Sequence, residues 1–226
     1  MHAYEEFRAP SRAAMLQVVR RNPFATLVTT GQDARGPVPV ATHLPVVVPP
    51  ASDPGLDALE DPFDDLVLWG HLGRANPQWR DFADGGRGLL VLTGPSRYVS
   101  PTTYEVEPAA PTWDYVAVHL TVELAPLWGD DDALAVVEAT VAALEGRRDP
   151  PWDPASSRDY FRRIVRGITA FTARVESATA VFKMSQDKPD DVYGRVRQDF
   201  ARTGDAALVD ALDTSNPGRG DGCPIR

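Results

Sequence analysis

Seven short segments rich in β-branched or alternating residues run through this chain, and most are bounded by Gly, Pro or Asp. Segments of this kind are typical of β-strands. They cover residues 24–30, 38–48, 66–72, 88–93, 113–124, 168–176 and 179–184. Because strands and helices do not alternate regularly along the chain, a doubly wound parallel sheet is disfavoured. The pattern predicts a mainly β member of the α+β class, an antiparallel barrel decorated by peripheral helices.

Helices are predicted where apolar residues recur at helical spacing next to capping signals. Ser11 can cap a first helix. Residues 130–145 carry an acidic first turn and a stripe of Leu and Val, which predicts a second. The pair Ser156 and Asp159 resembles a capping box ahead of a third. Two more helices are predicted at 192–200 and 206–212.

The length of 226 residues fits one good-sized domain, which we place at 1–214. Residues 49–65 are rich in Pro, Asp and Gly and predict a surface insertion, and residues 215–226 predict a flexible tail. No window has the ~18 uncharged apolar residues of a membrane helix, so no membrane association is expected. The single cysteine, Cys223, cannot form an internal disulfide, which favours the cytoplasm. The net charge of −9 makes nucleic acid an unfavourable partner.

Common catalytic motifs are absent from the sequence. It has no P-loop, GxGxxG, HExxH, CxxC or GxSxG pattern, which disfavours the nucleotide-binding, zinc-dependent and α/β-hydrolase classes that these motifs mark. The four histidines, His2, His43, His71 and His119, are far apart in sequence and give little support to a multi-histidine metal site.

Five segments at strand ends combine aromatic rings or imidazoles with hydrogen-bond donors. They are residues 41–45, 70–79, 93–101, 111–119 and 182–188. Such a mixture suits a flat, anionic cofactor, because rings stack on it while Arg, Lys, Ser and Thr bind its phosphate or carboxylates. Strand periodicity places Trp113, Tyr115 and His119 on one face, opposite a core stripe of Val and Leu. That aromatic and polar face suits either a ligand or a subunit interface.

These five segments, with Tyr4…Phe7-Arg8 and residues 22–29, resemble the PaiB-like family, often described as FMN-binding negative transcriptional regulators. The resemblance runs from about Tyr4 to about Phe200. It implies a split β-barrel of the flavin-reductase type, usually a homodimer with its cofactor sites at the subunit interface.

The family resemblance implies two branches with different cofactors. One branch binds FMN. The other, the piperazate synthases, is implied to bind heme b and to close N(delta)-hydroxy-ornithine into piperazic acid by forming an N–N bond with loss of water. This chain has Ser185-Gln186-Asp187-Lys188 where the family usually has Ser-Gln-Asn-Arg, which adds negative charge and loses a bidentate phosphate donor. Gly73 replaces the usual Ala and opens space beside His71. Both departures favour the heme branch.

In the heme interpretation, His71 is the axial ligand of the iron. The remaining cofactor contacts that we predict are Arg74, Asn76, Ser100, Trp113, Tyr115 and Lys183. Tyr98 and His119 are the candidates for the catalytic acid and base, and the substrate is a hydroxylamine amino acid.

Two other interpretations stay open at this point. In the first, Thr42, Arg74, Ser100 and Lys183 contact the phosphate of FMN, and the protein reduces flavin or represses transcription. In the second, the fold holds no cofactor and serves as a dimeric interaction protein.

Overall fold

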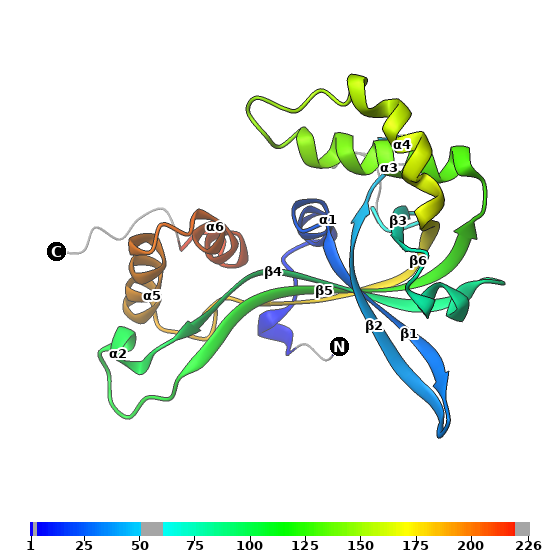
Figure 1. Cartoon of the computed structure of the whole chain (residues 1–226). Helices are drawn as coiled ribbons and strands as arrows, with labels where there is room; N and C mark the ends of the chain where they lie inside the picture. Colours follow the sequence, from blue (N-terminus) through cyan, green and yellow to red (C-terminus); the bar gives the residue numbers. More distant parts are fainter. Residues whose placement is uncertain (2–3, 51–60, 220–226) are drawn as a thin grey trace. The chain divides into compact units, whose positions relative to one another are not determined.

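Six strands close into a barrel in the order β1-β2-β3-β6-β5-β4 within the part of the chain that the structure describes, residues 1, 4–50 and 61–219. The structure is a computed structural model, and Figure 1 shows its elements. The strands are β1 (Phe24–Asp33), β2 (Gly36–Val47), β3 (Val67–Gly73), β4 (Gly86–Val99), β5 (Thr112–Leu127) and β6 (Ile168–Lys183). The pairs β1–β2, β1–β4, β2–β3 and β3–β6 are antiparallel, which confirms the predicted antiparallel barrel.

The prediction of seven strands is wrong by one. Residues 168–176 and 179–184, expected as two strands, belong to the single strand β6. Glu176, at the end of the first segment, and Ser177, just after it, are exposed polar residues and suggest a break in the sequence. Because no Gly or Pro interrupts this stretch, the extended backbone continues through it.

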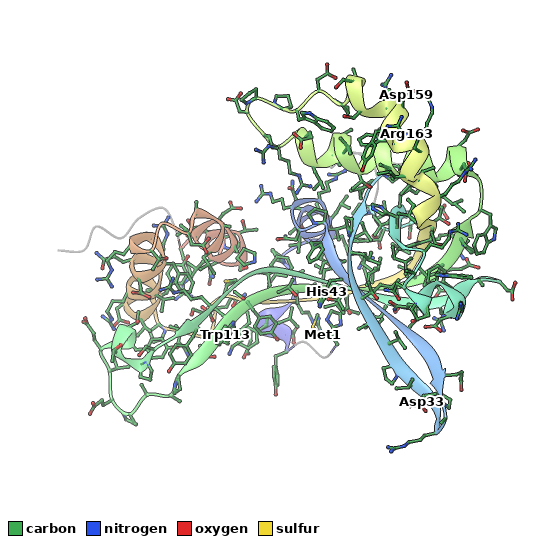
Figure 2. All side chains as sticks on the ribbon, viewed as in Figure 1. Met1, Asp33, His43, Trp113, Asp159 and Arg163 are labelled. Carbon is green, nitrogen blue, oxygen red and sulfur yellow. The ribbon has the colours of Figure 1, made fainter. Side chains whose placement is uncertain are left out.

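The β1–β2 hairpin is registered from Phe24 opposite Pro45 to Asp33 opposite Gly36. Asp33 stands at its tip (Figure 2), where its carboxylate accepts a 2.7 Å hydrogen bond from the backbone N–H of Arg35. Gly36 has a φ of 117°, a conformation that residues with a side chain rarely adopt. The turn chemistry therefore fixes the register of the hairpin.

The chain divides into two compact units, each with its own set of contacts. The barrel unit comprises Val19–Leu92 and His119–Ala178, and the terminal unit comprises Met1–Val18, Thr93–Val118 and Thr179–Arg226. Strands β4, β5 and β6 have residues in both units. The prediction of one domain over 1–214 is not tested by this division and stays a prediction.

The interior of the barrel unit is apolar. Leu27, Leu68, Leu90 and Phe171 are completely buried there. On the outside, α3 (Asp130–Glu145) packs over a cluster formed by Ala133, Val136, Val165 and Ala170, next to α4 (Arg158–Ile164) (Figure 1). The bounds of α3 match the predicted helix at 130–145.

Short 3₁₀ segments complete the barrel unit. They are η3 (Pro77–Phe82), η4 (Ala155–Ser157) and η5 (Val165–Gly167). The capping box predicted from Ser156 and Asp159 does not form, because the chain enters α4 directly from η4 and Ser157 stands at the N-cap without a side-chain bond.

The terminal unit adds helices to the ends of β4, β5 and β6. It holds η1 (Glu5–Phe7), most of α1 (Arg12–Arg21), α2 (Pro101–Tyr104), α5 (Asp190–Arg202) and α6 (Ala206–Ser215). Ser11 accepts a 3.0 Å hydrogen bond from the backbone N–H of Ala14, which confirms its predicted capping role. The helices predicted at 192–200 and 206–212 correspond to α5 and α6.

Parts of the predicted insertion and tail lie outside the described residues, namely 51–60 and 220–226, which include Cys223; His2 lies outside them as well. Within the described part of the tail, Asn216 is buried and its amide donates to the carbonyls of Met184 and Leu212 at 2.9 and 2.8 Å. None of the helices over the described ranges has both the length and the apolar run needed to cross a bilayer.

Candidate functional site

Strand β5 separates its side chains by face as the sequence predicts. Val116, Val118, Leu120 and Val122 are buried and form the core stripe. On the opposite face Tyr115 and His119 are half-buried and Trp113 is exposed, with Ala117 buried between them. The pattern leaves aromatic surface at the start of the strand, in the terminal unit.

An aromatic pair lies at that end of β5. The rings of Trp113 and Tyr98 have centroids 6.2 Å apart and meet at 60° (Figure 2 labels Trp113). Their side chains are 54% and 49% exposed, which is unusual for large rings in contact with each other. Exposed rings of this kind offer a surface on which a planar ligand can stack.

Lys183, at the end of β6, supplies positive charge in the same unit. Its ammonium donates a hydrogen bond to Oγ1 of Thr112 and lies 5.7 Å from the ring centroid of Phe7. Ser100, another predicted contact, caps α2: its oxygen accepts from the backbone N–H of Thr102 at 3.2 Å and from the Thr102 hydroxyl at 2.8 Å. The Ser100 oxygen therefore already has a structural role.

A buried carboxyl group in β5 was missed by the sequence analysis. Asp114 has 0% exposure, and its Oδ2 accepts a 2.6 Å hydrogen bond from Ser185. Its Oδ1 is buried without a hydrogen-bond partner among the described residues. Burial raises the pKa of Asp114 to about 6, against the opposing effects of the Ser185 hydrogen bond and the charge of Lys183.

Tyr104 is a second buried polar group in the terminal unit. Its hydroxyl has no hydrogen-bond partner within the described part of the chain. Burial, together with the negative charges of Asp114 and Asp187, raises the pKa of Tyr104 to about 12. The ammonium of Lys188 lies 5.4 Å from the Tyr104 ring centroid and 2.7 Å from Asp187. Tyr104 and Asp114 are therefore buried polar groups whose charges influence each other.

His71 lies in the barrel unit, on β3. The register pairs His71 with Ala170 and Trp69 with Thr172 across β6. Trp69 and Ala170 belong to the cluster beneath α3, so His71 lies on the face of β3 that α3 covers. Its Nδ1 is buried and unpaired as far as the described residues go, and burial lowers its pKa. The imidazole is therefore neutral at pH 7, the form that binds metals.

The loop after β3 fixes Arg74 and Asn76. Arg74 Nε donates to the carbonyl of Ile168 at 3.2 Å. Asn76 donates to Oγ1 of Thr42 at 2.8 Å, and its Oδ1 accepts from the backbone N–H of Gln78 at 3.0 Å. An ideal Cβ at Gly73 would meet nothing within 4 Å, and that Gly73 opens space beside His71 stays a prediction.

Gln78 is a further polar residue of this stretch, and it lies in η3. It is 1% exposed, and its amide nitrogen reaches the carbonyls of Leu27 and Val40 and the hydroxyl of Thr29 at 3.0–3.2 Å. Thr29 in turn donates a 2.6 Å hydrogen bond to Asp81. Gln78 therefore ties η3 to the β1–β2 hairpin.

The predicted site residues divide between the two units. Tyr98, Ser100, Trp113, Tyr115 and Lys183 lie in the terminal unit, and His71, Arg74, Asn76 and His119 lie in the barrel unit. Burial lowers the pKa of His119 as well. That these residues form one site, and that Tyr98 and His119 act together, stays a prediction. No group of three or more His, Cys, Asp or Glu side chains suited to a metal ion occurs over residues 1, 4–50 and 61–219.

The chain is similar in sequence to one family of domains and to one Bacillus subtilis protein. The family described as "Putative FMN-binding domain" matches residues 1–177. A Bacillus subtilis protein named "Protease synthase and sporulation protein PAI 2" is 30% identical over 198 residues, which cover 87% of each chain.

Two solved structures share the fold at low sequence identity. An FAD and heme binding protein from Mycobacterium smegmatis aligns with a TM-score of 0.54 at 15% identity, over 83% of this chain and 78% of that one. A protein described as a putative 5-nitroimidazole antibiotic resistance protein from Bacteroides thetaiotaomicron aligns with a TM-score of 0.51 at 8% identity, over 80% and 94%. With the barrel described above, these likenesses confirm the split-barrel fold.

Proposed function

Because the chain belongs to the putative FMN-binding domain family, we propose that it is a PaiB-like protein that binds FMN. The observation that carries this proposal is the family match over residues 1–177, which include the whole of β1 to β5 and most of β6. Asp187, Lys188 and Gly73 favour heme, whereas the family match favours flavin more strongly.

The chemistry of the terminal unit fits a flavin. The exposed rings of Trp113 and Tyr98 suit stacking against an isoalloxazine, and the ammonium of Lys183 suits the phosphate. Thr42 and Arg74 remain the phosphate contacts proposed from the barrel unit. Bound FMN would supply electron and hydride transfer. The output that we propose is regulation of transcription, with flavin reduction as the alternative.

A titration of the purified protein with FMN tests this proposal. We expect saturable quenching of flavin fluorescence and a shifted flavin absorption band, both weakened about tenfold or more by Trp113→Ala. Trp152→Ala is the matched control, because Trp152 is exposed to a similar degree, 47%, and belongs to no predicted cofactor contact. Absence of saturable binding, or equal loss in both variants, would overturn the proposal.

A second candidate function rests on His71. A half-buried imidazole whose pKa is lowered by burial, and whose buried Nδ1 lacks a partner among the described residues, fits the axial ligand of heme b. Heme iron would supply Lewis-acid chemistry for cyclising N(delta)-hydroxy-ornithine, and Tyr98 and His119 would hold or move the protons. A hemin titration separates the candidates: a Soret band that disappears in His71→Ala, together with conversion of the hydroxylamine substrate, would favour heme over FMN.

The assembly and location belong to the proposal as well. We propose a homodimer in the cytoplasm, on the family resemblance and on the single Cys223. Sedimentation or light scattering of the purified chain tests the dimer. A monomer that still binds FMN would remove the subunit-interface site while leaving the flavin proposal intact.

A further inference from the structure

A pocket of about 420 Å³ lies in the barrel unit, and its lining includes no residue assigned above to a cofactor. Its lining comes from the C-terminal half of α3 and from the stretch that runs through Trp152 into α4. Pockets of 300–1,000 Å³ are typical of sites for small organic ligands. Its lining includes Glu138, Val141, Ala142, Glu145, Trp152 and Phe161.

The walls of this pocket are mainly apolar and aromatic. The rings of Trp152 and Phe161 meet at 64° with centroids 6.3 Å apart. Val141 and Ala142 belong to the opposite wall, on α3. Trp152 is 47% exposed although a tryptophan gains free energy by burial, so a ligand in the pocket would cover apolar surface that is now in contact with water.

The electrostatics of the pocket favour a cation. It is lined by the last turns of α3, where the helix dipole places partial negative charge, and that helix has no basic residue in its last turn. Glu145 adds a full negative charge at this end. The guanidinium of Arg147, just beyond the helix, donates to the carbonyls of Arg20 and Arg21 instead, at the end of α1.

Two further cations lie at the pocket, Arg158, which is part of its lining, and Arg148, and both hold its carboxylates weakly. Arg158 is 3.6 Å from Glu138 and Arg148 is 3.7 Å from Glu145, and both arginines are largely exposed. Exposed pairs of this length contribute about 0–1 kcal/mol, so a cation inside the pocket can compete with them. An ammonium group over the face of the Trp152 ring also gains cation–π attraction.

We propose that this pocket binds an organic cation that carries an aromatic ring, in the class of protonated arylalkyl amines. The ring packs between Trp152, Phe161 and the apolar side chains of α3, and the ammonium pairs with Glu145. The site is independent of FMN or heme binding.

Isothermal titration with 2-phenylethylamine tests this proposal, with 2-phenylethanol as the neutral probe of the same shape. We expect saturable binding of the amine with a Kd of about 0.1–1 mM, the range for a ligand of this size, and at least tenfold weaker binding of the alcohol. The proposal is overturned if the amine shows no saturable binding up to 10-fold above that range, or if the alcohol binds equally well.

Variants locate the binding. Glu145→Gln keeps an acceptor for the 2.8 Å bond from the backbone N–H of Trp152 while removing the charge, and Trp152→Ala removes the ring. We expect each to weaken the amine at least fivefold. Glu176→Gln, which removes a charge paired with Arg87 outside the pocket, is the matched control. An equal loss in the control would place the binding elsewhere and overturn the proposal.

Discussion

The hydroxyl of Ser185 donates a 2.6 Å hydrogen bond to Oδ2 of Asp114, and both residues are almost completely buried in the terminal unit. Ser185 has a φ of 55°, in the left-handed region that side chains rarely tolerate. The hydrogen bond joins β5 to the segment that follows β6. It partly stabilises a carboxylate that burial otherwise disfavours.

Replacing this acid predicts a pH-dependent gain in stability. The pKa of Asp114 rises from 3.8 to about 6 on folding, so the folded state binds more protons than the unfolded state between these values. The stability that the group contributes is therefore full below about pH 4 and falls as the pH rises to about 6. The side chain of Asp114→Asn stays neutral at every pH. We therefore expect the free energy of unfolding of this variant to exceed that of the wild type at pH 8 by up to about 3 kcal/mol.

Urea unfolding at pH 4.5 and pH 8 measures this difference. The advantage of Asp114→Asn is expected to shrink at the lower pH. Asp84→Asn, at an exposed position, is the control and should show no comparable trend. An Asp114→Asn protein that is less stable than the wild type at pH 8 would mean that the charged form is needed in the fold.

The two glycines of β3 are expected to tolerate a methyl group to very different degrees. An ideal Cβ at Gly70 would stand 2.5 Å from Cζ of Phe171, whereas Gly73 has nothing within 4 Å. Because Phe171 is completely buried, Gly70→Ala should cost about 1–3 kcal/mol through overpacking. Gly73→Ala should change the free energy of unfolding by less than about 0.5 kcal/mol.

Thermal unfolding compares the two variants, and Phe171→Leu identifies the clash. In the Gly70→Ala background, the smaller side chain should recover part of the loss, although it costs stability on its own. If both alanine variants unfold like the wild type, the close approach of Gly70 to Phe171 is not a constraint on the barrel.

Much of the fold could be predicted from the sequence because local signals coincide with the structure. Helix α3 matches its predicted bounds since acidic residues begin it and Gly146 follows it. The prediction of two strands within β6 is wrong because exposed polar residues in its middle resemble the composition of a turn, although they include no Gly or Pro. Strand β6 pairs with strands that are distant in the sequence, and local composition does not show where such pairing continues.

The candidate site was predicted less completely, for a physical reason. Period-two alternation separated the faces of β5, yet one more step of the same alternation places Asp114 on the face of Val116 and Val118. A buried acid was therefore readable from the strand pattern. Its hydrogen bond to Ser185 was not, because 71 residues separate the partners. The pocket beside Trp152 could not be predicted either, because the segment 147–157 has no helical or strand periodicity in its hydrophobic residues.

Replacing the buried amide of Gln78 with a carboxyl group of the same shape is expected to destabilise the fold strongly. Its nitrogen faces three acceptors, two carbonyls and the Thr29 hydroxyl. Gln78→Glu keeps the shape but presents an oxygen to them, so we expect a loss of about 3 kcal/mol or more at pH 7. Gln32→Glu, on the exposed part of β1, is the control. Chemical denaturation of both variants measures the losses. If both losses are equally small, the hydrogen bonds of Gln78 do not stabilise the contact between η3 and the β1–β2 hairpin.

The ion pair between α5 and α6 is expected to lose its contribution to stability as the pH falls, whereas the contribution of Asp114 is lost as the pH rises. Arg197 donates two 2.7 Å hydrogen bonds to Asp213, which also accepts from the Tyr193 hydroxyl at 3.2 Å. The Arg197 bonds hold the pKa of Asp213 below 3.8. Its contribution is therefore full above about pH 4 and is lost as the pH falls through the lower folded value.

Asp213→Asn should lower the free energy of unfolding by about 1 kcal/mol at pH 7, a modest figure because the pair is a third exposed. The difference from the wild type should narrow at pH 3, measured by urea unfolding followed by far-UV circular dichroism. Asp199→Asn, whose pair with Arg202 is 3.3 Å long and lies within one helix, is expected to lose less at pH 7. A gap between Asp213→Asn and the wild type that stays constant from pH 7 to pH 3 would show that shape, and not charge, couples α5 to α6.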